Sequence, residues 1–255
     1  MNLIAAGLSD VGLQREINED SFCILPEYEL YIVADGMGGH KAGDVASKMA
    51  THAIASFFQA TASEDATWPF HFDPHLSVEE NRLITGIKVA NKKIYEMSSR
   101  HREVQGMGTT VVGCLFSRAN NKVYVAHVGD SRCYRIRDGE IALITRDHSL
   151  LNDYLLVMPD MTQEQRDELP KNVITRALGM QDTVVVDLVP EQPKIGDRYV
   201  LCSDGLSGMV TDEDIRDVVL ASEKDMEKAV KELVEMANKG GGEDNITVVC
   251  VAVTE

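Results

Sequence analysis

The apolar residues of this chain occur in short runs of β-strand length that do not alternate strictly with helices. Such runs cover residues 3–9, 21–25 and 30–34. Two helical patterns follow directly, at 45–58 and 83–97, where the spacing of apolar residues makes one stripe along each helix. Three strands followed by a pair of helices do not fit the repeating strand–helix–strand unit of a parallel sheet.

The rest of the chain again groups strands together and then helices. Helices are expected from Asp212 and over 224–238, Ser77 is a candidate N-cap, and the Asp-Gly pair within 137–140 predicts a hairpin turn. Further strand runs cover 109–116, 122–128, 131–137, 140–145, 183–189, 198–203 and 245–253. The pattern indicates one α+β domain with largely antiparallel sheets.

The stretch YIVADGMGGH, residues 31–40, places a carboxylate between an apolar run and a glycine-rich turn. Glycine turns often hold phosphates, but neither phosphate-binding pattern is complete here. His40 precedes Lys41 and Ala42 follows it, and a third glycine is missing at the required spacing. Asp35 would also repel a phosphate. A carboxylate beside glycine carbonyls instead suits a hard cation such as Mg²⁺ or Mn²⁺, which prefers oxygen ligands.

Acidic residues also mark the ends of other strand runs. Asp204 follows one run and Asp244 precedes the last, while Glu19 and Asp20 precede a strand and Asp130 follows one. Each acid taken alone is an ordinary polar turn residue. Carboxylates that converge repel one another unless cations lie between them, so their repetition predicts a metal site.

The formal net charge of −16 and the cysteines bear on partners and compartment. Neither nucleic acid nor an anionic membrane would attract this chain, so neither is expected as a partner. The five cysteines are scattered among apolar runs without a C-x-x-C pair, which is typical of reduced thiols. We see no secretion signal and no apolar run near the roughly 20 residues that cross a bilayer. A cytoplasmic protein is expected.

Eight segments, taken in order, identify a family. The metal-dependent serine/threonine protein phosphatases of type 2C have successive motifs that resemble REINED, VADGMGGH, GMGTTVVG, AHVGDSRCY, TRDHS, ITRALG, LCSDGL and GGEDNITVV of this chain. The resemblance runs from about Leu3 to the last strand, and the compact bacterial members look most similar. It implies a single catalytic domain over 1–255, folded as a four-layer αββα sandwich of two antiparallel sheets flanked by helix pairs.

The resemblance also implies a centre for two Mn²⁺ or Mg²⁺ ions at one end of the sandwich, between the sheets. Asp35 corresponds to the carboxylate that bridges both ions, and Gly36 to the residue that offers its carbonyl to one of them. Asp204 and Asp244 correspond to the ligands that complete the other site.

Further roles come from the same resemblance. Glu19 and Asp20 correspond to the acidic pair that binds or orients waters at the first ion, and Asp130 to a ligand of a weaker third ion. Arg15 corresponds to the arginine that grips the substrate phosphate, ideally through two parallel hydrogen bonds. Arg15 and Asp35 are therefore expected to be catalytic.

The implied reaction is hydrolysis of phosphoserine and phosphothreonine in proteins. Two cations about 3.5–4 Å apart share a water, lower its pKa and neutralise charge on the phosphoryl oxygens. No nucleophilic side chain is needed, so none is assigned to Cys202 or Ser203. Met37 stands where animal members often carry a histidine that protonates the leaving group. That role is not transferred to His40, and a water at the metals is the preferred donor.

Residues 149–172 correspond to a variable flap beside the active site of the family. Thr162 and Gln165 form a candidate capping box within it. Loops on a rigid scaffold commonly carry recognition, so the flap is expected to select substrates and to gate access. Phosphorylated proteins are the expected substrates, and a serine/threonine kinase is the expected antagonist.

Two other functions are compatible with parts of the sequence. A phosphatase-like scaffold or sensor without turnover would lack metal acids, whereas Asp35, Asp204 and Asp244 are all present. A metal-dependent nuclease or small-molecule phosphohydrolase would use similar ions. The charge and the lack of basic stripes disfavour polynucleotides, while small phosphoesters stay open as substrates.

Overall fold

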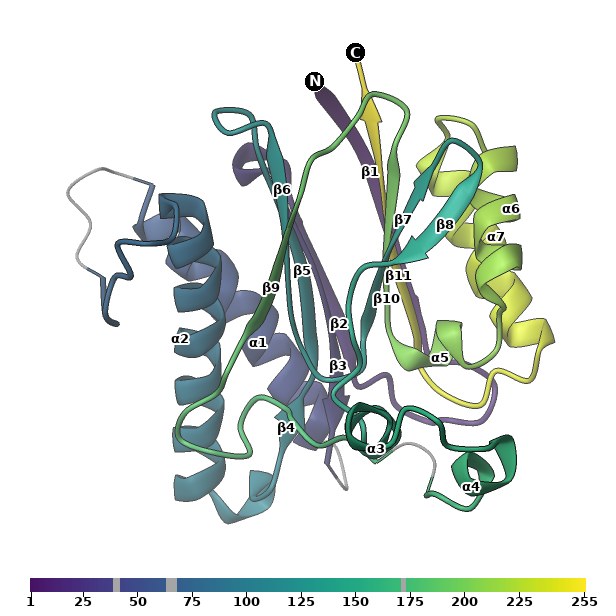
Figure 1. Ribbon diagram of the computed structural model, residues 1–255. Coiled ribbons are helices and arrows are strands. Elements are labelled where there is room, and N and C mark those ends of the chain that lie inside the picture. The colour runs from purple at the N-terminus through teal and green to yellow at the C-terminus, as the bar shows by residue number, and fades with distance from the viewer. Residues whose placement is uncertain (39–41, 63–67, 171–172) are drawn as a thin grey trace.

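Two β-sheets face each other at the centre of the protein (Figure 1). The computed structural model describes all residues except 39–41, 63–67 and 171–172. The first sheet has the strand order β1-β11-β10-β7-β8. Its strands are β1 (Asn2–Asp10), β7 (Arg132–Arg137), β8 (Glu140–Leu143), β10 (Arg198–Cys202) and β11 (Ile246–Thr254).

The second sheet has the strand order β2-β3-β5-β6-β9, and the short β4 pairs with the end of β3. Its strands are β2 (Asp20–Leu25), β3 (Leu30–Met37), β4 (Gly108–Thr109), β5 (Val111–Ser117), β6 (Lys122–Val128) and β9 (Asp187–Glu191). The pairings among the described strands of both sheets are antiparallel, which confirms the predicted sheet type.

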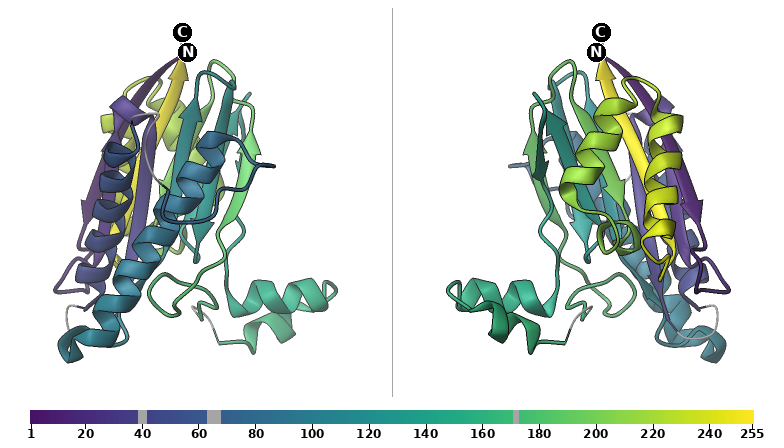
Figure 2. Two further views of the ribbon diagram at one scale, coloured as in Figure 1. Left: turned by 90° about the vertical axis from the view of Figure 1, so that its left-hand side faces the viewer. Right: turned by 90° about the vertical axis from the view of Figure 1, so that its right-hand side faces the viewer.

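Helices cover the outer face of each sheet (Figures 1 and 2). The second sheet is covered by α1 (Ala42–Ala60) and α2 (Val78–Arg100), and the first by α6 (Asp212–Ala221) and α7 (Met226–Lys239). A short helix, α5 (Asp204–Ser207), follows β10 directly. This arrangement confirms the predicted four-layer sandwich. Within the described part of the chain, no helix has both the length and the apolar character that crossing a membrane requires.

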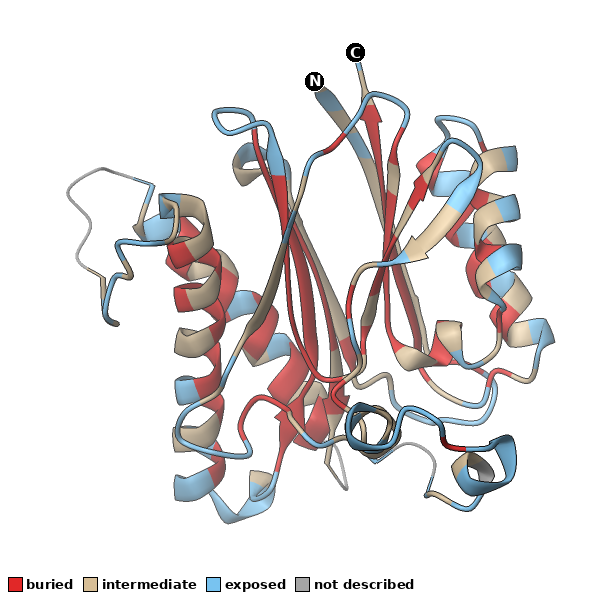
Figure 3. Ribbon diagram, in the orientation of Figure 1, coloured by how far each residue is buried: buried red, intermediate tan, exposed pale blue. Residues whose placement is uncertain are grey.

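Apolar side chains of both sheets form one cluster between them, and the facing strands are coloured largely as buried in Figure 3. Tyr31 of the second sheet and Tyr199 of the first both pack edge to face on Phe116. Val112 and Val249, which also belong to this layer, have no exposed surface. Arg135 of the first sheet and Glu191 of the second form an ion pair across this gap. Because an unpaired charge is costly in such an apolar layer, a group of like-charged acidic side chains is expected at its end.

Local signals in the sequence place the caps and the hairpin correctly. Ser77 caps α2 through a capping box, and Asp138 and Gly139 have positive φ angles in the β7–β8 turn. The predicted strand over 183–189 is partly wrong, because β9 begins only at Asp187. The preceding valines, 184 and 186, pack against the core beneath α1 and α2.

The apolar run before the glycine-rich turn predicts a strand end at Asp35, and this is also wrong. Gly36 and Met37 continue β3, where they pair with Thr109 and Gly108 of β4. Asp35 is therefore held inside a strand and not in a turn.

The described part of residues 149–172 stands out from the body of the sandwich (Figure 2). It contains α3 (Leu150–Val157) and α4 (Gln163–Asp167). Thr162 and Gln165 exchange the two hydrogen bonds of the predicted capping box. A bridge between Ser149 and Ile174 joins the two ends of this projection. We call residues 149–172 the flap.

Gly36 has no room for a side chain, which yields a test of the packing. A Cβ atom there would lie 2.1 Å from the carbonyl oxygen of Gly43 and 2.4 Å from that of Glu19. Both are backbone atoms that cannot swing away, so Gly36→Ala should lower the free energy of unfolding by at least about 1–3 kcal/mol in urea denaturation.

Gly113→Ala is the matched control, because its added Cβ would contact nothing closer than 3.6 Å. Its effect should stay within about 1 kcal/mol. Equal stabilities of the two variants would contradict the packing described for Gly36.

Candidate metal centre and active-site cleft

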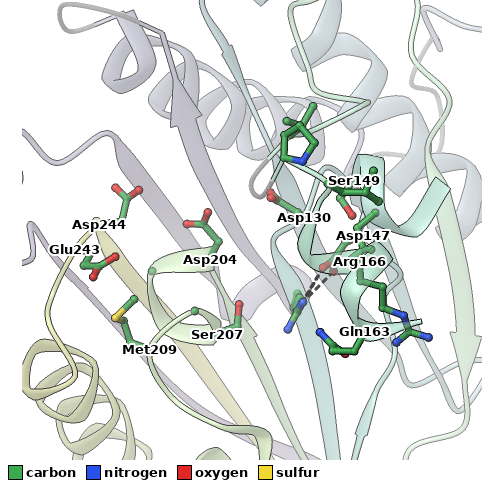
Figure 4. A pocket seen from close by; sticks show the side chains of 17 residues that line it. Asp130, Asp147, Ser149, Gln163, Arg166, Asp204, Ser207, Met209, Glu243 and Asp244 are labelled. Carbon is green, nitrogen blue, oxygen red and sulfur yellow. Dashed lines mark hydrogen bonds and ion pairs between the residues drawn. The ribbon is translucent and has the colours of Figure 1, made fainter. Parts of the chain in front are cut away.

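Five acidic residues from separate segments meet at one end of the sandwich. Asp20 begins β2, Asp35 lies in β3, Asp130 follows β6, Asp204 begins α5, and Asp244 precedes β11. The first two are direct cross-strand partners, and the last three line a cleft of about 480 Å³ (Figure 4). The structure therefore brings together the acids that the sequence singled out.

Asp35 lies at the centre of this group. Its backbone N–H donates to the hydroxyl of Thr110 at 3.1 Å. Its carbonyl oxygen accepts from the Thr110 N–H and from the Thr109 hydroxyl, both at 2.8 Å. Burial raises the pKa of the Asp35 carboxyl well above its usual range, and the charges of the four other acids raise it further. The fold thus holds this residue firmly where a negative charge is costly.

Asp20 is the buried member of the group, with 5 % of its surface exposed. Its Oδ2 accepts a hydrogen bond from the Ser203 hydroxyl at 2.8 Å, whereas its buried Oδ1 has no partner among the described residues. Burial raises the pKa of Asp20 to about 7, the hydroxyls of Thr247 and Ser203 oppose this shift, and the charges of Asp204 and Asp244 add to it. An unpartnered buried carboxylate oxygen is a position that a cation or its water would satisfy.

Asp204 and Asp130 are perturbed in the same direction. Burial and then the charge of Asp244 raise the pKa of Asp204, and a hydrogen bond with Asp35 opposes them. Burial and the charge of Asp204 raise the pKa of Asp130 to about 7. The mutual repulsion and the all-oxygen donor set fit Mg²⁺ or Mn²⁺.

A frame of backbone hydrogen bonds holds Glu19 and Gly36 beside the acids. The Gly36 N–H donates to the Glu19 carbonyl at 3.1 Å, and the Glu19 Oε1 accepts from the Gly43 N–H, also at 3.1 Å. Asn245 accepts from the Glu19 N–H at 2.7 Å and donates to two carbonyls between β1 and β2. No role for Asn245 was predicted from the sequence, although it directly follows Asp244. It joins the loop before β2 to the loop before β11.

Arg15 lies exposed at the mouth of the site. Its Nη2 contacts Asp244 Oδ2 at 2.7 Å, with 52 % of the Arg15 side chain and 38 % of the Asp244 side chain exposed. Exposed ion pairs of this kind contribute only about 0–1 kcal/mol. Arg15 can therefore exchange its contact with Asp244 for one with a substrate oxyanion at little cost.

Cys202 and Ser203 have surroundings that do not suit a nucleophile. Cys202 is fully buried, and burial raises the pKa of its thiol. The buried Ser203 hydroxyl donates to Asp20 and accepts from the Thr247 N–H at 2.9 Å. Its role is to hold Asp20 in place. His40, a residue considered for proton donation, lies outside the described residues.

A second group of metal-type side chains consists of His127, His148 and Asp187, whose donor atoms lie within 4.8 Å of one another. The Gly129 N–H donates to His148 Nδ1 at 3.0 Å, so the ring proton is on Nε2, which faces Asp187 at 3.3 Å. Arg176 donates to Asp187 at 2.6 Å and lies 3.0 Å from His148 Nε2. Its positive charge disfavours a cation there, and the group instead links β6, the base of the flap and β9.

Comparison with known proteins decides the family. The family model described as protein phosphatase 2C matches residues 14–247. This chain belongs to the protein phosphatase 2C family. The serine/threonine phosphatase stp of Listeria welshimeri is 34% identical to it over 251 residues, which cover 95% of this chain and 93% of the relative.

Solved structures agree with this assignment. The crystal structure of the Mycobacterium tuberculosis serine/threonine phosphatase PstP/Ppp is 35% identical, with a TM-score of 0.84 and 100% of both chains covered. A structure of the PstP catalytic domain in complex with 2 manganese ions covers 99% of both chains, with 35% identity and a TM-score of 0.81. The predicted family, fold and protein phosphatase class are confirmed. The predicted use of divalent cations agrees with the PstP complex, and the roles of individual residues stay predictions.

The acidic cluster predicts how stability depends on pH without metal. In the folded protein the pKa values of Asp20 and Asp130 are about 7, above their ordinary value of 3.8. Between these values the folded chain binds more protons than the unfolded chain, so this contribution lowers stability as pH rises from about 4 to about 7. Burial lowers the pKa values of His127 and His148, and this contribution acts in the opposite direction. Because more acids than histidines are shifted, the thermal midpoint in chelator should still fall across that window, and Mn²⁺ should raise it more at pH 7.5 than at pH 5.5.

Asp130→Asn provides the comparison, because it removes one of the titrating carboxyls. Its thermal midpoint in chelator should depend less steeply on pH than that of the unaltered protein. A metal-free midpoint that rises with pH by the same amount in both proteins would contradict the proposed repulsion.

Proposed function

We propose that this phosphatase removes phosphate from phosphoserine and phosphothreonine in protein substrates with two bound Mn²⁺ or Mg²⁺ ions. The main support is the convergence of Asp20, Asp35, Asp204 and Asp244 at one end of the sandwich. The family membership supplies the reaction class. The Listeria relative named above is a serine/threonine phosphatase, and PstP has been crystallised with two manganese ions.

The ligand roles follow the predicted assignment. Asp35 would bridge the two ions, and the Gly36 carbonyl would contact one of them. Asp204 and Asp244 would complete the second site. Asp35 suits the bridge because the charges of the surrounding acids all act on it, and Gly36 suits a carbonyl ligand because close backbone packing leaves no freedom around it.

The remaining acids would act at the margins of the centre. Asp20 and Glu19 would hold waters of the first ion, and the unpartnered Oδ1 of Asp20 suits such a contact. Asp130 would share a weaker third ion with Asp204. The two carboxyls are close enough for the charge of Asp204 to raise the pKa of Asp130. Ser203 keeps Asp20 oriented.

When bound, divalent cations of this kind lower the pKa of a shared water and neutralise charge on the phosphoryl oxygens. The chain's own residues position the substrate around that chemistry. Arg15 would leave Asp244 and donate to the phosphoryl oxygens through its planar guanidinium. Met37 has no proton to donate, so a water in the cleft is assigned to protonate the leaving alkoxide.

The flap would select protein substrates and gate access within a single catalytic domain. It supplies part of the cleft wall, including Ser149, Leu151 and Arg166. Its short helices project from a rigid sandwich, which lets them vary without disturbing the metal acids.

The setting that we propose is cytoplasmic signalling. All five cysteines are free thiols, and Cys114 and Cys133 lie 3.5 Å apart without forming a disulfide, which suits a reducing compartment. A serine/threonine kinase that phosphorylates the same substrates would be the antagonist.

Neutralising a metal carboxylate should abolish turnover and leave the fold intact. Asp35→Asn, Asp204→Asn and Asp244→Asn should each lower kcat for phosphate release from a phosphothreonine peptide with Mn²⁺ by at least about a hundredfold. Each substitution also removes a charge from a repulsive cluster, so metal-free stability should not fall. Chelation should stop turnover by the unaltered protein.

Asp138→Asn is the control, since Asp138 lies in the exposed β7–β8 turn and asparagine accepts its positive φ angle of 53°. It should retain full turnover. Near-normal turnover by any of the three site variants would remove that residue from the assignment. No phosphate release from phosphopeptides by the unaltered protein, with release from small phosphoesters, would overturn the proposed substrate class.

A further inference from the structure

The cleft beside the metal acids has two unlike walls (Figure 4). The wall formed by the sandwich carries Asp204, Met209, Glu243 and Asp244. The opposite wall includes the flap and carries Arg166. The volume of about 480 Å³ falls in the range of about 300–1,000 Å³ that is typical of ligand pockets. The cleft therefore has room for substrate groups beside the phosphorylated side chain.

The sandwich wall carries negative side chains and one arginine that is paired with a carboxylate of the same protein. Asp204 and Asp244 belong to the proposed metal centre, and Glu243 adds a further exposed carboxylate. Arg132 also lines the cleft, but it donates to both carboxylate oxygens of Asp147, at 3.0 and 2.7 Å. The positive charge of Arg132 is thus matched within the protein.

Arg166 differs from Arg132 in its partners. Its Nε donates to the carbonyl of Met161 at 3.2 Å, which fixes the base of the guanidinium. The two Nη groups have no hydrogen-bond partner among the described residues. No ion pair joins Arg166 to a carboxylate among the side chains that the structure describes. The capping box at Thr162 sets the start of the helix that carries it. In a chain of net charge −16, such a cation on a cleft wall points to an anionic partner.

We propose that Arg166 selects substrates that carry a carboxylate side chain close to the phosphorylated residue. The inference rests on the proposed phosphatase function, because the phosphorylated residue must enter this cleft. A guanidinium presents paired N–H donors that match the two oxygens of a carboxylate. Glu243 on the opposite wall would repel an acid on that side, so the preference should hold on only one side of the phosphorylated residue.

Apolar surface near Arg166 would strengthen this contact. Leu151, Leu169, Pro170 and Val173 also line the cleft. A substrate segment that packs on them excludes water from the ion pair, and opposite charges attract more strongly where less water surrounds them. The same surface would contact the aliphatic part of a glutamate side chain.

The test uses phosphothreonine peptides of equal length, with Asp, Asn or Lys placed in turn at each of the four positions on either side of the phosphothreonine. Turnover is measured with Mn²⁺ at low salt. At one or more positions on one side, kcat/KM should be about three- to fivefold higher for Asp than for Asn, the size expected of a partly exposed ion pair. The difference should reside in KM and should shrink at high salt.

Variants assign this preference to Arg166. Arg166→Glu should reverse it, so that Lys exceeds Asn at the same position, and Arg166→Lys should keep part of it. Arg100→Glu is the matched control: the Arg100 side chain is 72 % exposed on α2 and does not line the cleft. It should leave the ratio of Asp to Asn unchanged.

Two outcomes would overturn the proposal while leaving the proposed function intact. One is turnover of all peptides with no preference between Asp and Asn at any position. The other is a preference that survives unchanged in Arg166→Glu. Failure of the proposed function would appear differently, as absence of phosphate release from every peptide.

Discussion

Repulsion between carboxylates is the constraint on which the rest of this structure depends. Asp20 and Asp35 are cross-strand partners, and Asp204 and Asp244 approach them from the other sheet. Holding these like charges close together in a partly buried site costs free energy, as the raised pKa values of Asp20 and Asp35 indicate. Bound cations would offset this repulsion. Divalent cations that prefer oxygen ligands fit this set of carboxylates best.

The sandwich supplies the stability that such a cluster requires. The apolar layer between the sheets and the layers beneath the helices hold the strands that carry the acids. Asn245 and Ser203 then orient individual acids through hydrogen bonds that cross from one loop to another. The rigid sandwich thus holds the mutually repulsive acids in place. The flap stands outside the layers (Figure 2), so its residues can differ to suit different substrates without disturbing these acids.

Much of this could be predicted from the sequence because it depends on local pattern. Apolar runs gave most strands, and the Asp-Gly pair gave the β7–β8 turn. The continuation of β3 beyond Asp35 could not be predicted, because it depends on pairing with β4 over 70 residues later. The placement of Arg166 on the cleft wall likewise depends on how α3 and α4 are positioned relative to the sandwich, and no local pattern encodes that. The acids were found because charge at the ends of several strands is visible in the sequence, and the family motifs gave them roles.

Metal binding measured directly, without turnover, is the most direct test of the central claim. Isothermal titration of the metal-free protein with Mn²⁺ at pH 7.5 should give two tightly bound ions. The same titration of Asp35→Asn should lose tight binding at both sites, because one carboxylate is assigned to both ions. Two ions bound by Asp35→Asn with unchanged affinity would contradict the account, as would an unaltered protein that binds none.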